Sequence, residues 1–162
     1  MVSIPERIHL LELDVVDSTN RLARELGVNG AKPWTIVHAL EQTAGRGRRQ
    51  NDWLSPRGNL FLSAILKPIN GPKRWSELSF VISLAVADTV AVVTNRSIIG
   101  LKWPNDVLVN NKKISGILLE TGSNAKKESY LVVGVGLNIA HSPKGTRYGA
   151  TSINELILQK SS

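Results

Sequence analysis

The sequence predicts a mixed α/β domain (α+β), with a mixed, largely antiparallel sheet flanked by helices. Short β-branched apolar runs are interspersed with apolar residues at helical spacing, and two of the runs are joined by a hairpin signal. No strand is followed by a Gly-x-Gly-x-x-Gly turn, so a dinucleotide-binding fold is not expected. The 162 residues suffice for one core but not comfortably for two, and we expect a single domain over residues 1–162.

In the first half of the chain, strands are predicted over residues 8–16, 35–40 and 59–66. After the first of these come Ser18, Thr19 and Asn20, all residue types that favour a helix N-cap. Apolar residues at helical spacing then continue to Gly27, which predicts a helix. The segment over residues 42–58 is rich in Gly, Arg and Asn and is too polar to belong to the core.

In the second half, residues 77–93 are apolar and lack Gly and Pro, which predicts a largely buried helix. Further elements are predicted as a strand over 98–103, a hairpin of 107–109 with 113–120, a central strand over 130–139 and a helix over 152–160. The hairpin turn is Asn110-Asn111, a pair that tolerates positive φ. Gly134 and Gly136 lie in the central strand, where glycine indicates close approach by another group.

Composition excludes several classes of function. The chain has no cysteine, which rules out disulfides, thiolate zinc sites and thiol nucleophiles. His9, His38 and His141 lack metal-ligand spacing, so no metal site is expected. No uninterrupted apolar run approaches the roughly 18 residues of a membrane helix, and the N-terminus lacks a secretory apolar stretch. We therefore expect a cytoplasmic protein without membrane contact.

The charge is strongly positive, with 20 Lys and Arg against 13 Asp and Glu, a formal net charge of +7. A basic excess favours anionic partners such as nucleotides, acidic substrates or RNA. Part of the excess lies in one segment, QTAGRGRR over residues 42–49. Its glycines let the backbone wrap closely around a ligand, and its guanidinium groups suit carboxylate or phosphate oxygens. It lacks the Lys-Ser/Thr ending of a Walker A loop. An RNA tether is the alternative, but Trp53 follows closely and favours an ordered ligand loop.

A second motif, KWPND, covers residues 102–106. A turn between strands accounts for Pro104, Asn105 and Asp106. It does not account for Lys102, because a half-buried ammonium at the end of an apolar run is costly unless it meets an anion.

The ordered series of motifs closely resembles the catalytic domain of the biotin–protein ligases, also called biotin–[acetyl-CoA-carboxylase] ligases, over residues 13–156. The series is Ser18-Thr19-Asn20, QTAGRGRR (42–49), Trp53, NLFLS (59–63), KWPND (102–106), KISGILLE (113–120) and GVGLNI (134–139). The resemblance implies a fold related to class II aminoacyl-tRNA synthetases and lipoate ligases. It also implies that biotin and MgATP form biotinyl-5′-adenylate, and that biotin then passes to a lysine of a biotin carboxyl carrier protein or domain of acetyl-CoA carboxylase.

The resemblance also implies roles for individual residues. Biotin-binding positions would be Ser18, Thr19, Asn20, Gln42, Gly45, Arg46, Gly47, Trp53, Lys102, Gly116, Gly134 and Gly136. Adenylate-binding positions would be Arg46, Arg48, Lys102 and Asn138, with Lys102 and Arg48 acting in catalysis. Lys102 is then expected to converge with Arg46 and Arg48 on the acid group of biotin.

The chain departs from the family at its end, since family members continue through a further helical region and a small β-barrel. We therefore expect a catalytic domain truncated at the C-terminus. No helix-turn-helix precedes it, so DNA binding is not expected, and a homodimer remains open. The alternatives are a biotin-binding fragment without full catalysis, and a lipoate or octanoate ligase or transferase on the related fold.

Overall fold

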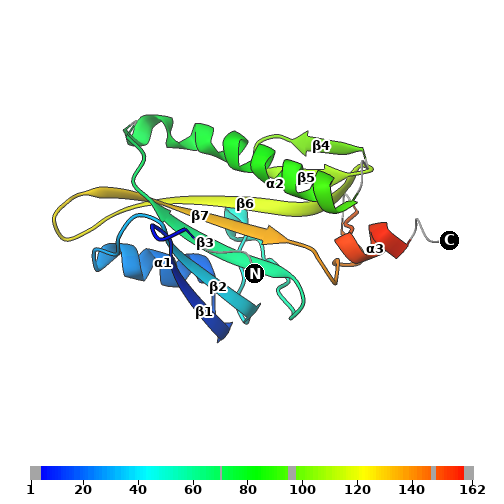
Figure 1. The fold of residues 1–162 in the computed structure, drawn as a ribbon, viewed down its shortest axis with the longest axis horizontal. Helices are drawn as coiled ribbons and strands as arrows, with labels where there is room; N and C mark the ends of the chain where they lie inside the picture. Colours follow the sequence, from blue (N-terminus) through cyan, green and yellow to red (C-terminus); the bar gives the residue numbers. More distant parts are fainter. Residues whose placement is uncertain (1–4, 70, 95–97, 147–148, 159–162) are drawn as a thin grey trace.

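The fold is built on a seven-stranded sheet with the strand order β1-β2-β3-β7-β6-β5-β4 (Figure 1). The computed structural model describes residues 5–69, 71–94, 98–146 and 149–158. The strands are β1 (His9–Val16), β2 (Thr35–Gln42), β3 (Leu60–Leu66), β4 (Ile99–Lys102), β5 (Asp106–Val109), β6 (Lys112–Ser123) and β7 (Ser129–Leu137). Strands β1 and β2 are parallel, and the other neighbouring pairs of this sheet are antiparallel. The predicted fold class is confirmed.

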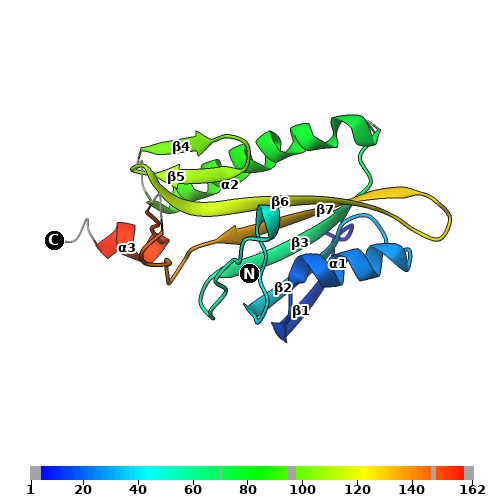
Figure 2. The ribbon, with the colours of Figure 1, turned by 180° about the vertical axis from the view of Figure 1, so that it is seen from behind.

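Helices lie on both faces of the sheet. They are α1 (Thr19–Val28), α2 (Leu78–Thr94) and α3 (Ile153–Leu158), with short 3-10 helices η1 (Arg48–Gln50) and η2 (Pro72–Glu77). Helix α1 covers one face, and α2 covers the other (Figure 1). The segment between β2 and β3, which carries η1, lies on the same side of the sheet as α1 (Figure 2).

The hairpin of β5 and β6 forms as predicted. Asn110 and Asn111 have φ angles of 49° and 62°, so both central turn residues adopt the left-handed conformation. Asparagine tolerates this conformation, and such a turn matches the twist of the two strands it joins. The predicted central strand is also confirmed, because β7 lies between β3 and β6.

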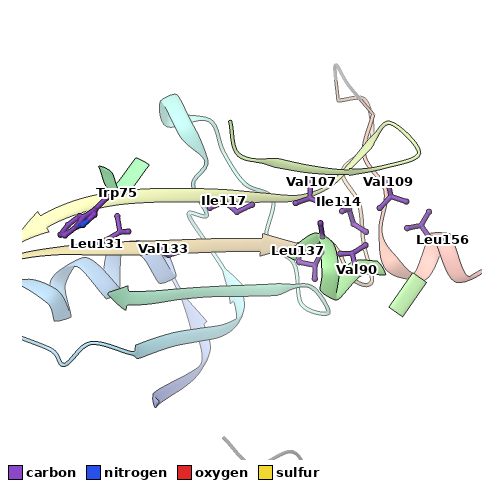
Figure 3. Packing of buried hydrophobic residues seen from close by; sticks show 11 residues of the cluster. Trp75, Val90, Val107, Val109, Ile114, Ile117, Leu131, Val133, Leu137 and Leu156 are labelled. Carbon is purple, nitrogen blue, oxygen red and sulfur yellow. The ribbon is translucent and has the colours of Figure 1, made fainter. Parts of the chain in front are cut away.

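The strands divide their side chains between two hydrophobic clusters. The larger cluster lies between the sheet and α2 and includes Val90, Leu131 and Val133 (Figure 3). The smaller cluster lies under α1 and includes Ala23, Ile65, Tyr130 and Val132. Successive residues of β7 thus point to opposite faces, as strand geometry requires.

Helix α2 is much less buried than predicted. Its outer face exposes 44% of Phe80, 56% of Val81 and 82% of Val92. The prediction of a largely buried helix was wrong because apolar residues surround this helix, whereas only one side of it meets the sheet. By length and composition alone, the run Pro72–Thr94 would suffice to cross a membrane, since an 18-residue window within it has a mean hydropathy of 1.7, and 28% of that window is buried. Ser, Thr and Asp residues interrupt this run, so it is not an uninterrupted apolar stretch. Its mean hydropathy nevertheless stays as high as that of a membrane span.

The last described helix, α3, packs against the larger cluster through its first part. Leu156 joins that cluster and Ile153 packs against it, whereas Ile157 and Leu158 are exposed. Residues 159 and 160, the end of the predicted helix, lie outside the described residues.

Truncating Val90, which is fully buried, to alanine should lower the free energy of unfolding by about 2 kcal/mol, since two methyl groups leave a cavity under α2. Val92→Ala, two residues along the same helix, removes the same atoms from an exposed site and should change stability by less than about 0.5 kcal/mol. Urea denaturation of both variants measures the difference. Equal losses would contradict the orientation of α2.

Candidate functional site

Two adjoining cavities open on the α1 side of the sheet. The first has a volume of about 460 Å³ and the second about 750 Å³. They share a wall formed by Gln42, Asn51, Asp52, Trp53, Asp106 and Lys113. Two segments far apart in the sequence meet at this wall. One is the end of β2 with the loop that follows it, and the other is the β5–β6 hairpin.

Every residue predicted for the site lines one or both cavities. The first cavity is lined by Ser18, Thr19, Asn20, Gln42, Arg46, Gly47, Arg48, Trp53, Gly116, Gly134 and Gly136. The second is lined by Gln42, Gly45, Trp53, Lys102 and Asn138. Lys102 lies on β4 and lines the second cavity, whereas Arg46 and Arg48 line the first, so the convergence of all three on one acid group stays a prediction.

Glycines form the floor of the first cavity. The register pairs Gly116 of β6 with Gly136 of β7, and Gly134 follows on the same face. A Cβ atom on Gly134 would collide with the side-chain amide of Asn20, and one on Gly136 would lie 2.5 Å from the indole ring of Trp53. The glycines thus allow two side chains of the site to lie directly on the sheet backbone.

The N-terminus of α1 is capped by a side chain from the end of β2. Ser18 occupies the N-cap position, but its side chain makes no capping hydrogen bond. Instead, the Thr19 backbone N–H donates to Gln42 Oε1 over 2.8 Å. Gln42 Nε2 in turn donates to Ser55 Oγ over 2.8 Å. Ser18 thus marks the helix start as predicted, but Gln42 supplies the capping oxygen and joins the helix start to the loop.

Asn20 is held by two residues that the sequence analysis did not single out. Ser63 Oγ donates to Asn20 Oδ1 over 2.6 Å, and Asn20 Nδ2 donates to Glu120 Oε2 over 2.8 Å. Both partners end motif segments already noted, NLFLS and KISGILLE. Their position was the available signal, but only the three-dimensional fold shows that they meet Asn20.

The arginines of the loop are held at different points. Arg46 Nη2 lies 3.2 Å from Glu120 Oε2 in an ion pair. Arg48 Nη1 donates to Asn105 Oδ1 over 3.2 Å, and Asn105 Nδ2 donates to the carbonyl of Ile117 on β6. Asn105 of KWPND therefore positions Arg48 beside the sheet.

Lys113 was also missed, although it supplies the ammonium group at the wall between the cavities. Its Nζ lies 2.6 Å from Asp106 Oδ1 and 5.2 Å from the centroid of the Trp53 ring. Ammonium groups this close to an aromatic face are attracted by its quadrupole. The signal in the sequence was an aspartate directly before one arm of the predicted hairpin and a lysine at the start of the other.

Asn138 is buried and tied into the end of β7. Its Nδ2 donates to the carbonyl of Thr151 over 3.1 Å. The turn after Asn138 is organised by Asn59, whose Oδ1 accepts the backbone N–H groups of Ile139, Ala140 and His141. This further missed residue stabilises the segment that leads along the second cavity.

The loop between β2 and β3 is attached to β1 at both ends. Thr43 N–H donates to the carbonyl of Val16. At the other end Arg57 donates to Asp14 over 2.7 Å. That hydrogen bond, together with the positive charge, lowers the pKa of Asp14. The arginine motif is therefore carried by a loop with fixed ends.

The fold gives an α/β domain with two adjoining cavities, the first lined by the side-chain amides of Asn20 and Gln42, and their common wall carrying the ammonium-bearing Lys113. The chain belongs to the biotin/lipoate A/B protein ligase family, whose model matches residues 12–138.

Named relatives and solved structures agree with this family. A biotin–[acetyl-CoA-carboxylase] ligase of Paracoccus denitrificans is 40% identical over 130 residues, which are 78% of this chain and 53% of that protein. One from Mycobacterium tuberculosis is 35% identical over 153 residues, 90% of this chain and 56% of that protein. The chain thus spans about half the length of these relatives.

Among solved structures, the biotin protein ligase of Leishmania major in complex with biotinyl-5-AMP has a TM-score of 0.80 and 32% identity. The match covers 98% of this chain and 67% of that one. The biotin protein ligase of Aquifex aeolicus in complex with biotin and ATP has a TM-score of 0.74 and 32% identity, with 93% and 66% covered.

Gly136→Ala should destabilise the domain by about 1–3 kcal/mol, because the new Cβ atom overlaps the Trp53 indole. Gly100→Ala, where an added Cβ atom would meet open space, should be neutral or slightly stabilising. Chemical denaturation of the single variants and of Gly136→Ala combined with Trp53→Ala completes a double-mutant cycle. The second change should relieve most of the loss, and additive effects would contradict the contact.

Proposed function

We propose that this domain is the adenylating part of a biotin–protein ligase. It would join biotin to ATP and then transfer the biotinyl group to a lysine of a carrier domain. The observation that carries the proposal is the position of Lys113, whose ammonium lines both cavities beside Asp106 and Trp53. A cation at that wall suits a reaction in which an acid group in one cavity attacks a phosphate in the other.

In the first step a carboxylate oxygen of biotin attacks the α-phosphorus of ATP. A new C–O–P linkage forms, the bond between the α-phosphorus and the bridging oxygen breaks, and pyrophosphate leaves. Two anions must approach each other, so fixed cations lower the barrier most where charge accumulates. Lys113 and Arg48 are proposed to supply these cations, and Mg²⁺ would arrive on the phosphates of ATP.

The first cavity is proposed to hold the ring system of biotin. Asn20 and Trp53, which lie on its glycines, line this cavity, and the side-chain amides of Asn20 and Gln42 supply N–H groups for a ureido carbonyl. Ser18, Thr19 and Gly47 line the same cavity, and Arg46 is held at its edge by Glu120.

The second cavity is proposed to hold the nucleotide part. Lys102, Gly45 and Asn138 line it, so that Lys102 would act on the phosphates and not on the biotin ring. The position of Lys102 in this cavity supports the adenylate-binding role that the resemblance implies for it.

In the second step a lysine amine of the acceptor attacks the acyl carbon. An amide forms, AMP leaves and the amine loses a proton. Relatives named for acetyl-CoA carboxylase support a biotin carboxyl carrier domain as the acceptor. We place the reaction in the cytoplasm, where ATP is plentiful and a chain without cysteine requires no oxidising compartment.

The decisive test is mass spectrometry of the protein incubated with biotin and MgATP. Biotinyl-5′-adenylate and pyrophosphate are the expected products, and lipoic acid in place of biotin should give neither. Binding of biotin without adenylate would indicate a binding fragment, and adenylation of lipoic acid in preference to biotin would indicate a lipoate ligase. Either result would contradict the proposal.

Substitution of Lys113 and of Lys102 should have different effects on biotin binding and on adenylate formation. Lys113→Ala should weaken biotin binding and slow adenylate formation by about 10²-fold or more, because its ammonium serves both cavities. Lys102→Ala should slow adenylate formation comparably while leaving biotin affinity within about twofold. Calorimetry with biotin and pyrophosphate release measure the two effects, with Lys126→Ala on the exposed β6–β7 turn as the control. A loss of biotin affinity in Lys102→Ala alone would reverse the assignment.

A further inference from the structure

Two residues that do not line the first cavity determine which atoms Asn20 offers to it. Ser63 is fully buried on β3, and only 20% of the Glu120 side chain on β6 is exposed. The strand register places Ser63 beside Gly134, and Asn20 lies over that glycine. Helix α1 and strands β3 and β6 thus contribute one residue each to a chain of hydrogen bonds, Ser63–Asn20–Glu120.

The orientation of the Asn20 amide follows from the chemistry of its partners. A carboxylate only accepts hydrogen bonds, so the amide nitrogen of Asn20 must face Glu120. The amide oxygen then faces Ser63, whose hydroxyl donates to it over 2.6 Å. The oxygen is thereby engaged within the protein, and one of the two N–H bonds of the nitrogen is left for a ligand.

Gln42 is oriented in the same sense by different partners. Its Oε1 accepts the backbone N–H of Thr19, a group that only donates, and its Nε2 donates to Ser55. Ser55 Oγ donates onward to the carbonyl of Trp53 over 2.7 Å, so it accepts from Gln42. The side-chain oxygens of Asn20 and Gln42 are therefore both bonded to groups of the protein. Each amide nitrogen keeps one N–H for a ligand.

Glu120 also pairs with the positive charges at this end of the cavity. Arg46 and Arg24 lie 3.2 Å and 3.6 Å from its oxygens. Both arginines are therefore held by the carboxylate that orients Asn20. An uncharged ring then meets oriented N–H donors there.

We propose that Glu120 and Ser63 are positioning residues that make the first cavity selective for a ligand with a strong hydrogen-bond acceptor, such as a ureido carbonyl oxygen. This inference rests on the proposed function, in which that ligand is biotin. If Glu120 becomes neutral, the amide of Asn20 can turn over, because glutamine donates as well as accepts and the Ser63 hydroxyl does the same. The cavity would then lose its preference for an acceptor.

The test compares biotin with 2-thiobiotin, a neutral analogue whose thiocarbonyl sulfur accepts hydrogen bonds more weakly. The ratio of their dissociation constants is measured by calorimetry. The unmodified protein should prefer biotin, and Glu120→Gln should reduce that preference about fivefold to tenfold, as expected for loss of one oriented hydrogen bond. Ser63→Ala removes the donor to the amide oxygen but leaves Glu120 in place, so it should reduce the preference by less. The two ligands have the same net charge, so the charge change in Glu120→Gln does not alter the ratio.

Matched controls separate orientation from a general loss of structure. Glu128→Gln neutralises an exposed carboxylate near the far end of the sheet, where it pairs with Lys67. Ser83→Ala removes a buried hydroxyl on α2 that has no hydrogen-bond partner among the described residues. Both controls should keep the ratio of the unmodified protein.

If Glu120→Gln and Ser63→Ala weaken both ligands equally, the two residues are merely structural and the inference is overturned. If the unmodified protein binds neither ligand, the proposed function itself fails. If the unmodified protein binds both without preference, only the inference fails.

Discussion

The site depends on three glycines at the surface of the sheet. Gly116, Gly134 and Gly136, on neighbouring strands, leave room on the α1 side for side chains from other segments. Asn20 and Trp53 occupy the space that Cβ atoms would otherwise fill. Because interiors are close-packed, even one methyl group there would displace the amide or the indole. These glycines therefore determine the cavity floor, the position of α1 and the wall between the cavities.

The opposite face of the same strands provides the rigidity that such a surface lacks. In β7, Val135 lies between the two glycines and packs against the larger cluster, and Leu131 and Val133, which precede the glycines, belong to it (Figure 3). Strand alternation thus assigns one set of residues to the core and the other to the ligand. A bare floor is stable here because large aliphatic side chains on the reverse side bury the same backbone.

The helices and strands were predicted more accurately from the sequence than the burial and contacts of their side chains. Alternating apolar residues and the Asn110-Asn111 turn define the hairpin locally, so it was predicted correctly. The exposure of α2 was not, because its composition is apolar on every side and composition does not indicate which side has a neighbour. Lys113 was not singled out, because its place in a motif does not show that its side chain lies beside Asp106 and Trp53.

Long-range partners were the least predictable part of the site. Ser63 and Glu120 are 43 and 100 positions from Asn20, and neither residue type signals a ligand contact by itself. Both stood in recognised motifs, yet a motif gives order along the chain and not the direction of a hydrogen bond. Only the fold shows that a carboxylate, which accepts but does not donate, faces the amide nitrogen.

The charges of the site have a consistent arrangement. Lys113 is paired with Asp106, so its ammonium is held at the wall before any ligand arrives. Arg48 contacts the neutral amide of Asn105, and no carboxylate among the described residues forms an ion pair with it. An arriving anion therefore shares Lys113 with Asp106 but meets the full charge of Arg48. Under the proposed function, Lys113 would fix where the two anions meet, and Arg48 would supply the charge that offsets their repulsion.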